Sequence, residues 1–564
     1  MAESNTDKSN ANSEVSRKDP SSKSGETTKE MIMANGDEME KIPFSAAGPT
    51  SQSEKVKSSE DEDQKQQLLL DAKRQDQIDA ARALNPKIAY PQGRLTSSLA
   101  FTAFSITLAS FQFGYHIGCV NAPGELITSW FVDSHKTLFE TELTKEKADL
   151  AWAVAVSVFA VGGMVGGLMS GWLADKAGRR GALMYNNILA LGAAALMGFA
   201  KYAGAYPMII IGRLLIGLNC GLSSGLVPMY LTEVSPINLR GMLGSLHQLL
   251  VTIAILVSQI FGLPQLMGTA DLWPLIFAFT VVPAILQLIT LPMCPESPKY
   301  TMGVRGQRDD AEKALKKLRG VDDVSVEINA MQEEADVASA QEKPTMGSMF
   351  KGALLWPMSI AIMMMLAQQL SGINVAMFYS TVIFKGAGLT GNEPFYATIG
   401  MGAVNVIMTI IAVWLVDHPK FGRRSLLLMG LTTMLVSTLL LVGALTLQMK
   451  GADYAWASYS AIGFVLLFVI GFATGPGAIP WFFVSEIFDS SARGNANSIA
   501  VMVNWAANLI VALTFLPINN ALHQFSFFVF SAFLAFFIFY TWKFVPETKG
   551  KSIDQIQAEF DKRR

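Results

Sequence analysis

Long apolar segments alternate with short polar loops over most of this chain, from residue 95 onward. A 19-residue window finds twelve such segments, each long enough to cross about 30 Å of hydrocarbon as a helix. Lipid-facing backbone must satisfy its own hydrogen bonds, and runs this long lack the ~10-residue alternation of a membrane barrel, so the pattern predicts an α-helical bundle. The segments lie at 97–119, 150–174, 182–200, 207–230, 242–263, 272–294, 352–384, 395–416, 425–449, 457–484, 496–518 and 523–542.

The loops between these segments contain an internal repeat, because three groups of charged residues recur at a nearly constant offset. The recurring groups are Gly178-Arg179-Arg180 with Gly422-Arg423-Arg424, Glu233 and Arg240 with Glu486 and Arg493, and Pro295-Glu296 with Pro546-Glu547. A duplicated set of six segments predicts an all-α membrane protein with twelve transmembrane helices. Its two parallel six-helix halves describe the major facilitator fold, in which substrate lies between the halves near the bilayer midplane.

The polar stretches set the domain boundaries. The first ninety-four residues are rich in Ser, Lys, Glu, Asp and Gln and have only Phe44 and Tyr90 as aromatic residues, so they cannot bury enough apolar surface to offset chain entropy. They also lack the apolar core of a signal peptide, so internal segments must direct membrane insertion. In the charged linker, 308–320 predicts an amphipathic surface helix. The expected domains are a disordered tail 1–94, a first half 95–294, a helical linker 295–350, a second half 351–545 and a C-terminal tail 546–564.

Lys and Arg are concentrated in the loops after the second, fourth, eighth and tenth apolar segments. The positive-inside rule therefore places these loops in the cytoplasm. With an even number of spans, both termini and the linker 295–350 are expected on the same side.

Composition and charge exclude several classes of function. The chain has 564 residues, of which 51% are hydrophobic and 16% charged, with a net charge of −2 and no basic patch for nucleic acid. Cys119, Cys220 and Cys294 lie in or beside apolar runs and do not form a secreted disulfide framework. The spans contain no Ser/His/Asp or metal cluster, and the Gly-Lys-Ser at 550–552 lacks the upstream glycine of an ATP-binding loop. The sequence predicts no enzyme, metal or cofactor.

Arg213 is the one formally charged residue in the twelve segments. Carriers coupled to protons, sodium or metal usually need a membrane-embedded Asp or Glu, which costs about 2.5–3.5 kcal/mol to insert. None is present, which favours transport without a coupling ion. Arg213 could cap a neighbouring helix end or act in the mechanism, and His116 could bond as a neutral group or titrate.

Uncharged amides are frequent in the spans. Amides both donate and accept hydrogen bonds, which suits a neutral polyol, and the flat faces of Phe472 and Trp481 suit the C–H side of a sugar ring. The alternative role of each amide is to join neighbouring helices. Ser371-Gly372, after one amide pair, and Gly475-Pro476-Gly477 are expected to interrupt their helices. The amides are Gln248, Gln368, Gln369, Asn374, Asn405, Asn504 and Asn508.

Acidic and basic residues at the predicted cytoplasmic rim suggest a gate. Glu233 and Arg240 have the same spacing as Glu486 and Arg493, so each half presents an acid and a base. Ion pairs between the halves could form when this side is shut and break when it opens. The alternative is that the basic residues only set topology. The candidate gate residues are Glu233, Arg240, Arg179, Arg180, Arg423, Arg424, Glu486 and Arg493.

Several motifs together resemble the sugar-porter signatures of the major facilitator superfamily, and within it the animal facilitative hexose transporters. The resemblance covers roughly residues 95–555. The motifs are FQFGYHIGCVNAP (111–123), GWLADKAGRR (171–180), VPMYLTEVSPINLRG (227–241), PESPKY (295–300), QQLSGIN (368–374), GPGAIPWFFVSEIF (475–488) and PETKGKS (546–552).

The resemblance implies a plasma-membrane protein that binds a hexose, most simply D-glucose, and moves it by facilitated diffusion in the lipid bilayer. Ala473 replaces a glutamate of well-known members, and His116 stands where proton-coupled relatives have an aspartate. Proton-coupled symport and a hexose sensor acting through the tail stay as alternatives. Glucose or fructose preference and the oligomeric state stay open. The implied hexose contacts are Gln248, Gln368, Gln369, Asn374, Asn405, Trp481 and Asn504, with Phe113, Phe472 and Trp505 lining the cavity.

Overall fold

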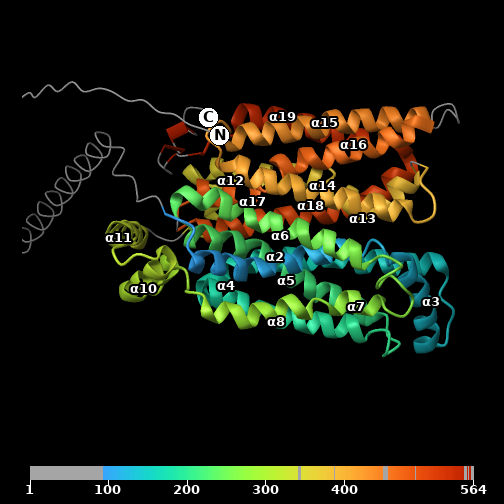
Figure 1. The fold of residues 1–564 in the computed structure, drawn as a ribbon, viewed down its shortest axis with the longest axis horizontal. Helices are drawn as coiled ribbons and strands as arrows, with labels where there is room; N and C mark the ends of the chain where they lie inside the picture. The colour runs from blue at the N-terminus through green and yellow to red at the C-terminus, as the bar shows by residue number, and fades with distance from the viewer. Residues whose placement is uncertain are drawn as a thin grey trace, which may run out of the picture. The chain divides into compact units, whose positions relative to one another are not determined.

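The computed structural model describes residues 93–340, 344–386, 388–448, 455–489 and 491–549, with 551, 555–556 and 558–559 near the end of the chain. All regular structure in these ranges is helical. The predicted disordered tail lies outside the described residues except for its last two positions. We call α2 to α8 the N-terminal half and α12 to α19 the C-terminal half, and Figure 1 shows these two sets side by side.

The bounds of the helices are as follows. The N-terminal half contains α2 (Ser97–Gly118), α3 (Gly124–Phe139), α4 (Lys145–Phe199), α5 (Pro207–Val234), α6 (Arg240–Phe261), α7 (Trp273–Ala278) and α8 (Val281–Thr290). The linker contains α9 (Pro298–Gly303), α10 (Arg308–Arg319) and α11 (Ser325–Ala340). The C-terminal half contains α12 (Leu355–Leu370), α13 (Ile373–Gly386), α14 (Glu393–Asp417), α15 (Arg423–Gln448), α16 (Ala455–Thr474), α17 (Ile479–Ile487), α18 (Arg493–Leu522) and α19 (Phe527–Phe544).

All twelve predicted apolar segments coincide with helix. Ten helices in the described chain are long and apolar enough to cross a membrane. The difference from twelve has two causes. The predicted segments 150–174 and 182–200 both lie in α4, which consists of two helices that meet at Gly178, where φ is +80° and the backbone is not helical. The helix α2 over the first segment is 22 residues long, but its Ser, Thr, Gln and Gly residues lower its mean hydropathy.

The structure confirms both predicted helix interruptions. Gly372 separates α12 from α13 with φ +92°, a backbone conformation that favours glycine, and a Cβ there would lie 2.9 Å from the ring of Phe530. The second interruption separates α16 from α17 at Gly475-Pro476-Gly477. Both interruptions are in the C-terminal half, close to the predicted amides.

Helices outside the bundle lie at its two ends. The predicted amphipathic helix at 308–320 is α10, which ends at Gly320 with φ +67°. Sequence reasoning missed α11 in the linker and α3 in the loop 121–149. In Figure 1, α10 and α11 lie at one end of the helices and α3 at the other. We call the first the basic end, because Arg179 and Arg423 lie there, and the second the α3 end.

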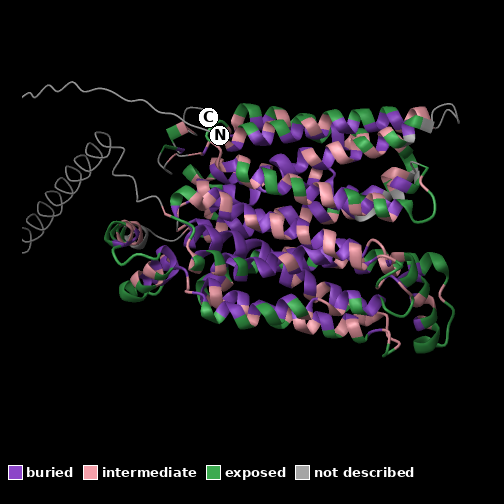
Figure 2. Cartoon of the chain, in the orientation of Figure 1, coloured by how far each residue is buried: buried purple, intermediate pink, exposed green. Residues whose placement is uncertain are grey.

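Buried residues run through the centre of the bundle, and exposed residues lie mainly on its outer helix faces (Figure 2). Many of the exposed residues are large and apolar, such as Trp172, Ile188 and Trp414. An apolar outer surface on long helices suits contact with lipid. The described fold is therefore that of a multi-span membrane protein.

Candidate functional site

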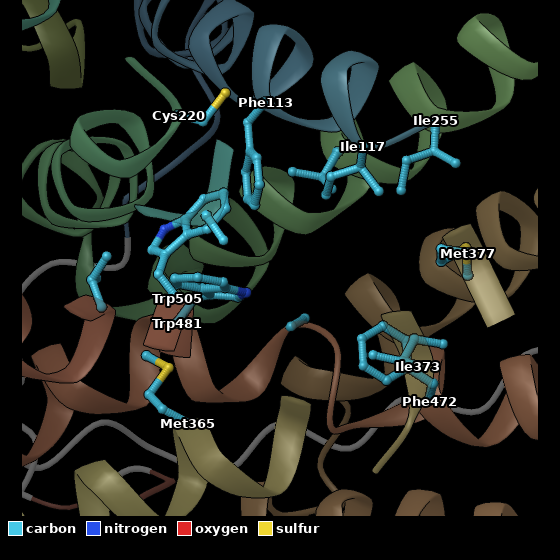
Figure 3. Close-up of a cluster of buried hydrophobic side chains, with 14 of the residues drawn as sticks. Phe113, Ile117, Cys220, Ile255, Met365, Ile373, Met377, Phe472, Trp481 and Trp505 are labelled. Carbon is cyan, nitrogen blue, oxygen red and sulfur yellow. The ribbon is translucent and has the colours of Figure 1, made fainter. Parts of the chain in front are cut away.

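A small cavity of about 40 Å³ lies between the two halves. This volume is below the roughly 300–1,000 Å³ that is typical of small-molecule sites. Figure 3 shows the apolar part of its wall, with Phe113, Ile117 and Ile255 across from Ile373 and Phe472. The lining residues are Phe113, Ile117, Gln248, Val251, Ile255, Gln368, Gln369, Ile373, Asn374, Met377, Asn405, Phe472 and Trp481.

Four amides of the C-terminal half hold one another beside the cavity. Gln369 donates from Nε2 to Oδ1 of Asn504 at 2.9 Å, and Asn504 donates from Nδ2 to Oε1 of Gln368 at 2.8 Å. Asn374 donates in turn to Oε1 of Gln369. Asn504 does not line the cavity, so its place in the described conformation is behind Gln368 and Gln369, where it positions them.

Gln368 also connects the two interrupted helices. Its Nε2 donates to the carbonyl oxygens of Pro476 at 3.0 Å and Gly477 at 2.9 Å. These carbonyls are free to accept because the helix is broken at Gly475-Pro476-Gly477. A movement of the Gln368 side chain would therefore act on the segment 475–477, which precedes Trp481.

Two other lining amides keep capacity for a ligand. Gln248 has no hydrogen-bond partner among the described residues, although its side chain is mostly buried. Oδ1 of Asn405 is buried and also unpartnered within the described chain. Buried polar groups are normally bonded, and a polar ligand would supply the missing partner.

The predicted aromatic residues surround one side of the cavity. The ring of Phe113 lies 6.5 Å from that of Trp481 and 5.3 Å from that of Trp505. Trp505 does not line the cavity; it lies behind Phe113 and against Gly163 of α4, where a Cβ would collide with the indole. Phe113, Phe472 and Trp481 are thus in the wall, and Trp505 supports it.

Contacts between the halves close the cavity toward the α3 end. Asn121, which follows α2, donates from Nδ2 to Oγ of Ser380 on α13 at 2.9 Å. Its Oδ1 accepts from the hydroxyl of Thr381 at 3.0 Å. Sequence reasoning did not select these residues, although Asn121 stands within the motif at 111–123. They hold α13 over the cavity.

At the basic end, the two acids of the predicted gate are paired inside their own halves. Arg179 donates from Nε and Nη2 to the carboxylate of Glu233 at 2.8 and 2.9 Å. Arg423 lies 3.3 Å from Glu486. The expectation of pairs between the halves therefore needs correction for these four residues. The reason is local, because the chain before each arginine turns back and brings the guanidinium onto the neighbouring helix of the same half.

A second pair of acids, Glu296 and Glu547, fixes those turns. Glu296 accepts from the backbone N–H groups of Arg179 at 3.0 Å and Arg180 at 3.1 Å. Glu547 does the same for Arg423 at 2.8 Å and Arg424 at 3.2 Å. A carboxylate at a helix N-terminus satisfies free N–H groups and complements the helix dipole. Gly178 and Gly422 leave room for these carboxylates, since a Cβ at either position would collide with them.

The halves meet at the basic end through other contacts. Asp417, at the end of α14, accepts from the backbone N–H of Met242 on α6 at 2.7 Å. Ser498 of α18 accepts from the N–H of Gly171 at 2.9 Å, and Asn497 donates to the carbonyl of Gly225 at 2.9 Å. In the sequence Asp417 lies five residues before Gly422, whereas Asp175 lies three residues before Gly178, so the repeat does not single out Asp417. Contacts between the halves are therefore present at both ends of the described conformation.

The other basic residues of the predicted gate bind backbone carbonyls or face one cleft. Arg180 donates to Cys294 at 3.0 Å, Arg493 donates to Phe488 at 3.1 Å, and Arg424 donates to Trp542. Arg493 lines a cleft with Lys299. Burial lowers the pKa of Lys299; the carboxylate of Glu334 opposes this, and the charges of Arg493 and Arg240 add to it. Asp175, Glu233 and Glu334 also line this cleft, so charges of both signs meet there.

Arg213 bonds the end of a neighbouring helix. Its Nη1 donates to the carbonyl oxygen of His116 at 3.1 Å, and its guanidinium lies 4.2 Å from the ring centre of Phe159. The imidazole of His116 bonds separately, through Nε2, to the hydroxyl of Thr280 at 2.6 Å. Arg213 therefore caps the end of α2 through a backbone carbonyl, which is the helix-capping role expected from the sequence.

Comparison with known proteins gives one consistent result. The family model "Sugar (and other) transporter" matches residues 102–560. The chain is 82% identical over 478 residues to facilitated glucose transporter protein 1 of Caenorhabditis elegans, covering 85% of this chain and 94% of that protein. It is 42% identical over 506 residues to the mouse facilitated glucose transporter member 2, covering 84% of this chain and 95% of that one.

Solved structures of a bacterial sugar carrier match the fold. A proton:xylose symporter bound to 6-bromo-6-deoxy-D-glucose has a TM-score of 0.70 at 26% identity, covering 83% of this chain and 100% of that one. The inward-open form of the xylose transporter of E. coli has a TM-score of 0.61 at 27% identity, covering 82% and 99%. The lower score for the inward-open form agrees with the contacts that close the basic end here.

Proposed function

Because this chain belongs to the sugar transporter family, we propose that it carries a hexose, with D-glucose as the first candidate, across the plasma membrane by facilitated diffusion. The observation that carries the proposal is the cavity between the halves, whose polar lining consists of uncharged amides and one indole. Amides that donate and accept in one plane match hydroxyl groups that do both. Aromatic faces beside them match the apolar side of the sugar ring.

The lining residues have separate roles in this proposal. Gln248 and Asn405 bond the hexose with their free amide atoms, and Trp481 covers one face of it. Gln368, Gln369 and Asn374 bond it from the C-terminal half, with Asn504 orienting them from behind. Phe113 and Phe472 complete the wall, and Trp505 supports Phe113.

Transport without a coupling ion is supported by the spans themselves. No Asp or Glu lies in the twelve apolar segments, and Arg213 bonds a backbone carbonyl. A few neutral hydrogen bonds of about 1 kcal/mol each correspond to roughly millimolar affinity, or about −4 kcal/mol. Such weak binding permits release on the far side.

The cycle follows from the contacts between the halves at the two ends. We place the basic end and both termini in the cytoplasm, according to the positive-inside rule. Hexose enters from outside, α13 closes over it at Gly372, and the contacts of Asp417, Ser498 and Asn497 then separate to release it inward. The paired rims around Glu233 and Glu486 move as rigid parts of their own halves.

Sugar uptake into proteoliposomes tests this function. Labelled D-glucose should equilibrate at the same final level with and without an inward proton gradient and never exceed the outside concentration. Unlabelled fructose as competitor then reports on sugar preference. Accumulation that collapses with a proton ionophore would instead establish symport. Glucose binding without flux would point to a sensor, whose output should be lost when residues 1–90 are deleted.

A further inference from the structure

Two helices from different halves, α6 and α14, form a seam along the whole depth of the bundle. They run in opposite directions, as three contacts show. At the basic end Met242 bonds Asp417, and near the α3 end Gln265, in the turn after α6, donates to the hydroxyl of Tyr396 at 3.3 Å. Between these two contacts, the side chain of Gln259 on α6 meets Gly402 on α14.

Gln259 is the unusual residue of this seam. Its side chain is 5% exposed, and neither Oε1 nor Nε2 has a hydrogen-bond partner among the described residues. The amide fits there because residue 402 is glycine, whose missing Cβ leaves the space that Oε1 fills. A buried amide that loses both its donor and its acceptor bonds carries a large desolvation cost, so it calls for an explanation.

The place of Gln259 along the seam suggests the explanation. It lies one helical turn from Ile255, and Gly402 lies one turn from Asn405; both Ile255 and Asn405 line the cavity. Gln259 on α6 and Gly402 on α14 both lie closer to the α3 end than the cavity-lining residues Ile255 and Asn405 do. Gln259 therefore stands between the sugar cavity and the side that we place outside the cell.

We propose that Gln259 is a further sugar-binding residue, whose amide bonds a hexose hydroxyl while the outer side is open and is separated from it when α6 and α14 close. The proposal rests on the proposed hexose transport and adds a contact that only sugar arriving from outside makes. On closure the sugar moves one turn deeper, to Gln248 and Asn405, and the amide is left against Gly402.

The proposal predicts an effect on one side of the membrane. Gln259→Met, which keeps the length of the side chain but removes the amide, should weaken the apparent affinity for D-glucose about fivefold from outside, the loss of roughly one hydrogen bond. Apparent affinity from inside should stay unchanged. Right-side-out and inside-out membrane vesicles carrying the full chain measure both, with Gln259→Leu as a second variant if the first one folds poorly.

Deoxy sugars sharpen the test. Monodeoxy analogues of D-glucose compete with labelled D-glucose from outside, and the analogue that lacks the hydroxyl bound by Gln259 should be a weaker competitor for the wild type. For Gln259→Met the same analogue should compete as well as D-glucose does. This non-additivity is the signature of a direct contact, as in a double-mutant cycle.

Two control variants separate a direct sugar contact from a structural or a conformational role of Gln259. Gln265→Met removes an exposed amide of the same seam and should leave the apparent affinity for D-glucose unchanged from outside and from inside. Gln248→Leu should weaken this affinity from both sides. For Gln259→Met, an equal loss of apparent affinity from both sides would show a structural role. Weaker affinity from outside with tighter affinity from inside, by the same factor, would show a conformational role. Either result would overturn the proposed contact between Gln259 and the sugar. If the wild type carries no D-glucose at all, the proposed function itself fails.

Discussion

The two walls of the cavity differ in chemistry. The N-terminal half contributes mainly apolar side chains, with Gln248 as its one amide, whereas the C-terminal half contributes Gln368, Gln369, Asn374 and Asn405. Most of the capacity for hydrogen bonding a sugar therefore lies in one half. The other half supplies a largely apolar surface for the ring.

The backbone behind the walls differs in the same way. In the N-terminal half, α2 and α6 are unbroken beside the cavity, and buried amides bond one another away from it: Gln112 donates to Asn187 at 2.9 Å and Asn187 to Gln287 at 2.9 Å. In the C-terminal half the amides lie at the two helix interruptions. The half that we propose to recognise sugar is thus also the half with the interrupted helices, and this arrangement would couple binding to closure.

The largest expected effect is that of Gln369→Leu. Gln369 donates to Asn504 and accepts from Asn374, so leucine leaves two buried amides short of a partner and removes sugar contacts. We expect D-glucose affinity to fall about 30-fold or more, the equivalent of ~2 kcal/mol, with a lower temperature of thermal unfolding. Binding titration and thermal unfolding of the purified protein measure the two. An unchanged affinity would remove the amide cluster from the sugar site.

Gly372→Ala should mainly slow transport. Its φ of +92° disfavours any side chain, and a Cβ would press on Phe530. The strain, on the order of 1–2 kcal/mol, should lower the turnover rate about tenfold while binding changes less. The matched control is Gly443→Ala in α15, where a Cβ meets nothing within 4 Å. Equal loss in both variants would show that α13 does not bend at Gly372.

Gln248→Leu tests the other wall. Gln248 has no bond to the described residues, so its loss should weaken D-glucose about five- to tenfold, near 1 kcal/mol, and leave the unfolding temperature unchanged. The comparison with Gln369→Leu separates a residue that contacts only ligand from one that also stabilises the protein. A large fall in the unfolding temperature of Gln248→Leu would contradict this difference.

The smallest expected effect is that of Asp417→Asn. The neutral amide can still accept from Met242, but the charge that strengthens this bond and pairs with Arg423 is lost. The equilibrium should shift toward the conformation open at the basic end by about threefold, less than 1 kcal/mol. Double electron–electron resonance between spin labels on α6 and α14 measures the shift. A shift toward closure would show that Asp417 does not hold this end shut.

The sequence was sufficient for the fold and for most of the cavity. Apolar segment length and the repeated Gly-Arg-Arg and Pro-Glu groups predict the helices, and Gly372 and Gly475-Pro476-Gly477 predict the interruptions. Amide composition predicts most of the polar residues that line the cavity. These features are local in the chain, so pattern and residue type are enough.

The structure was needed where a side chain could contact any of several other residues. Glu233 could pair with any of several arginines, and burial beside Arg179 decides it. Asn504 resembles the lining amides in sequence, yet the packing of α18 places it behind them. The roles of Asp417, Asn121 and Gln259 depend on which helices of the two halves face each other, and no local pattern encodes that.

The most direct test of facilitated hexose transport is counterflow. Proteoliposomes loaded with unlabelled D-glucose and diluted into a trace of labelled D-glucose should accumulate label transiently above its outside concentration, because a carrier that alternates between two sides exchanges sugar. A proton ionophore should leave this overshoot unchanged, and loading with L-glucose should abolish it. Label that only equilibrates, with no overshoot, would contradict the account.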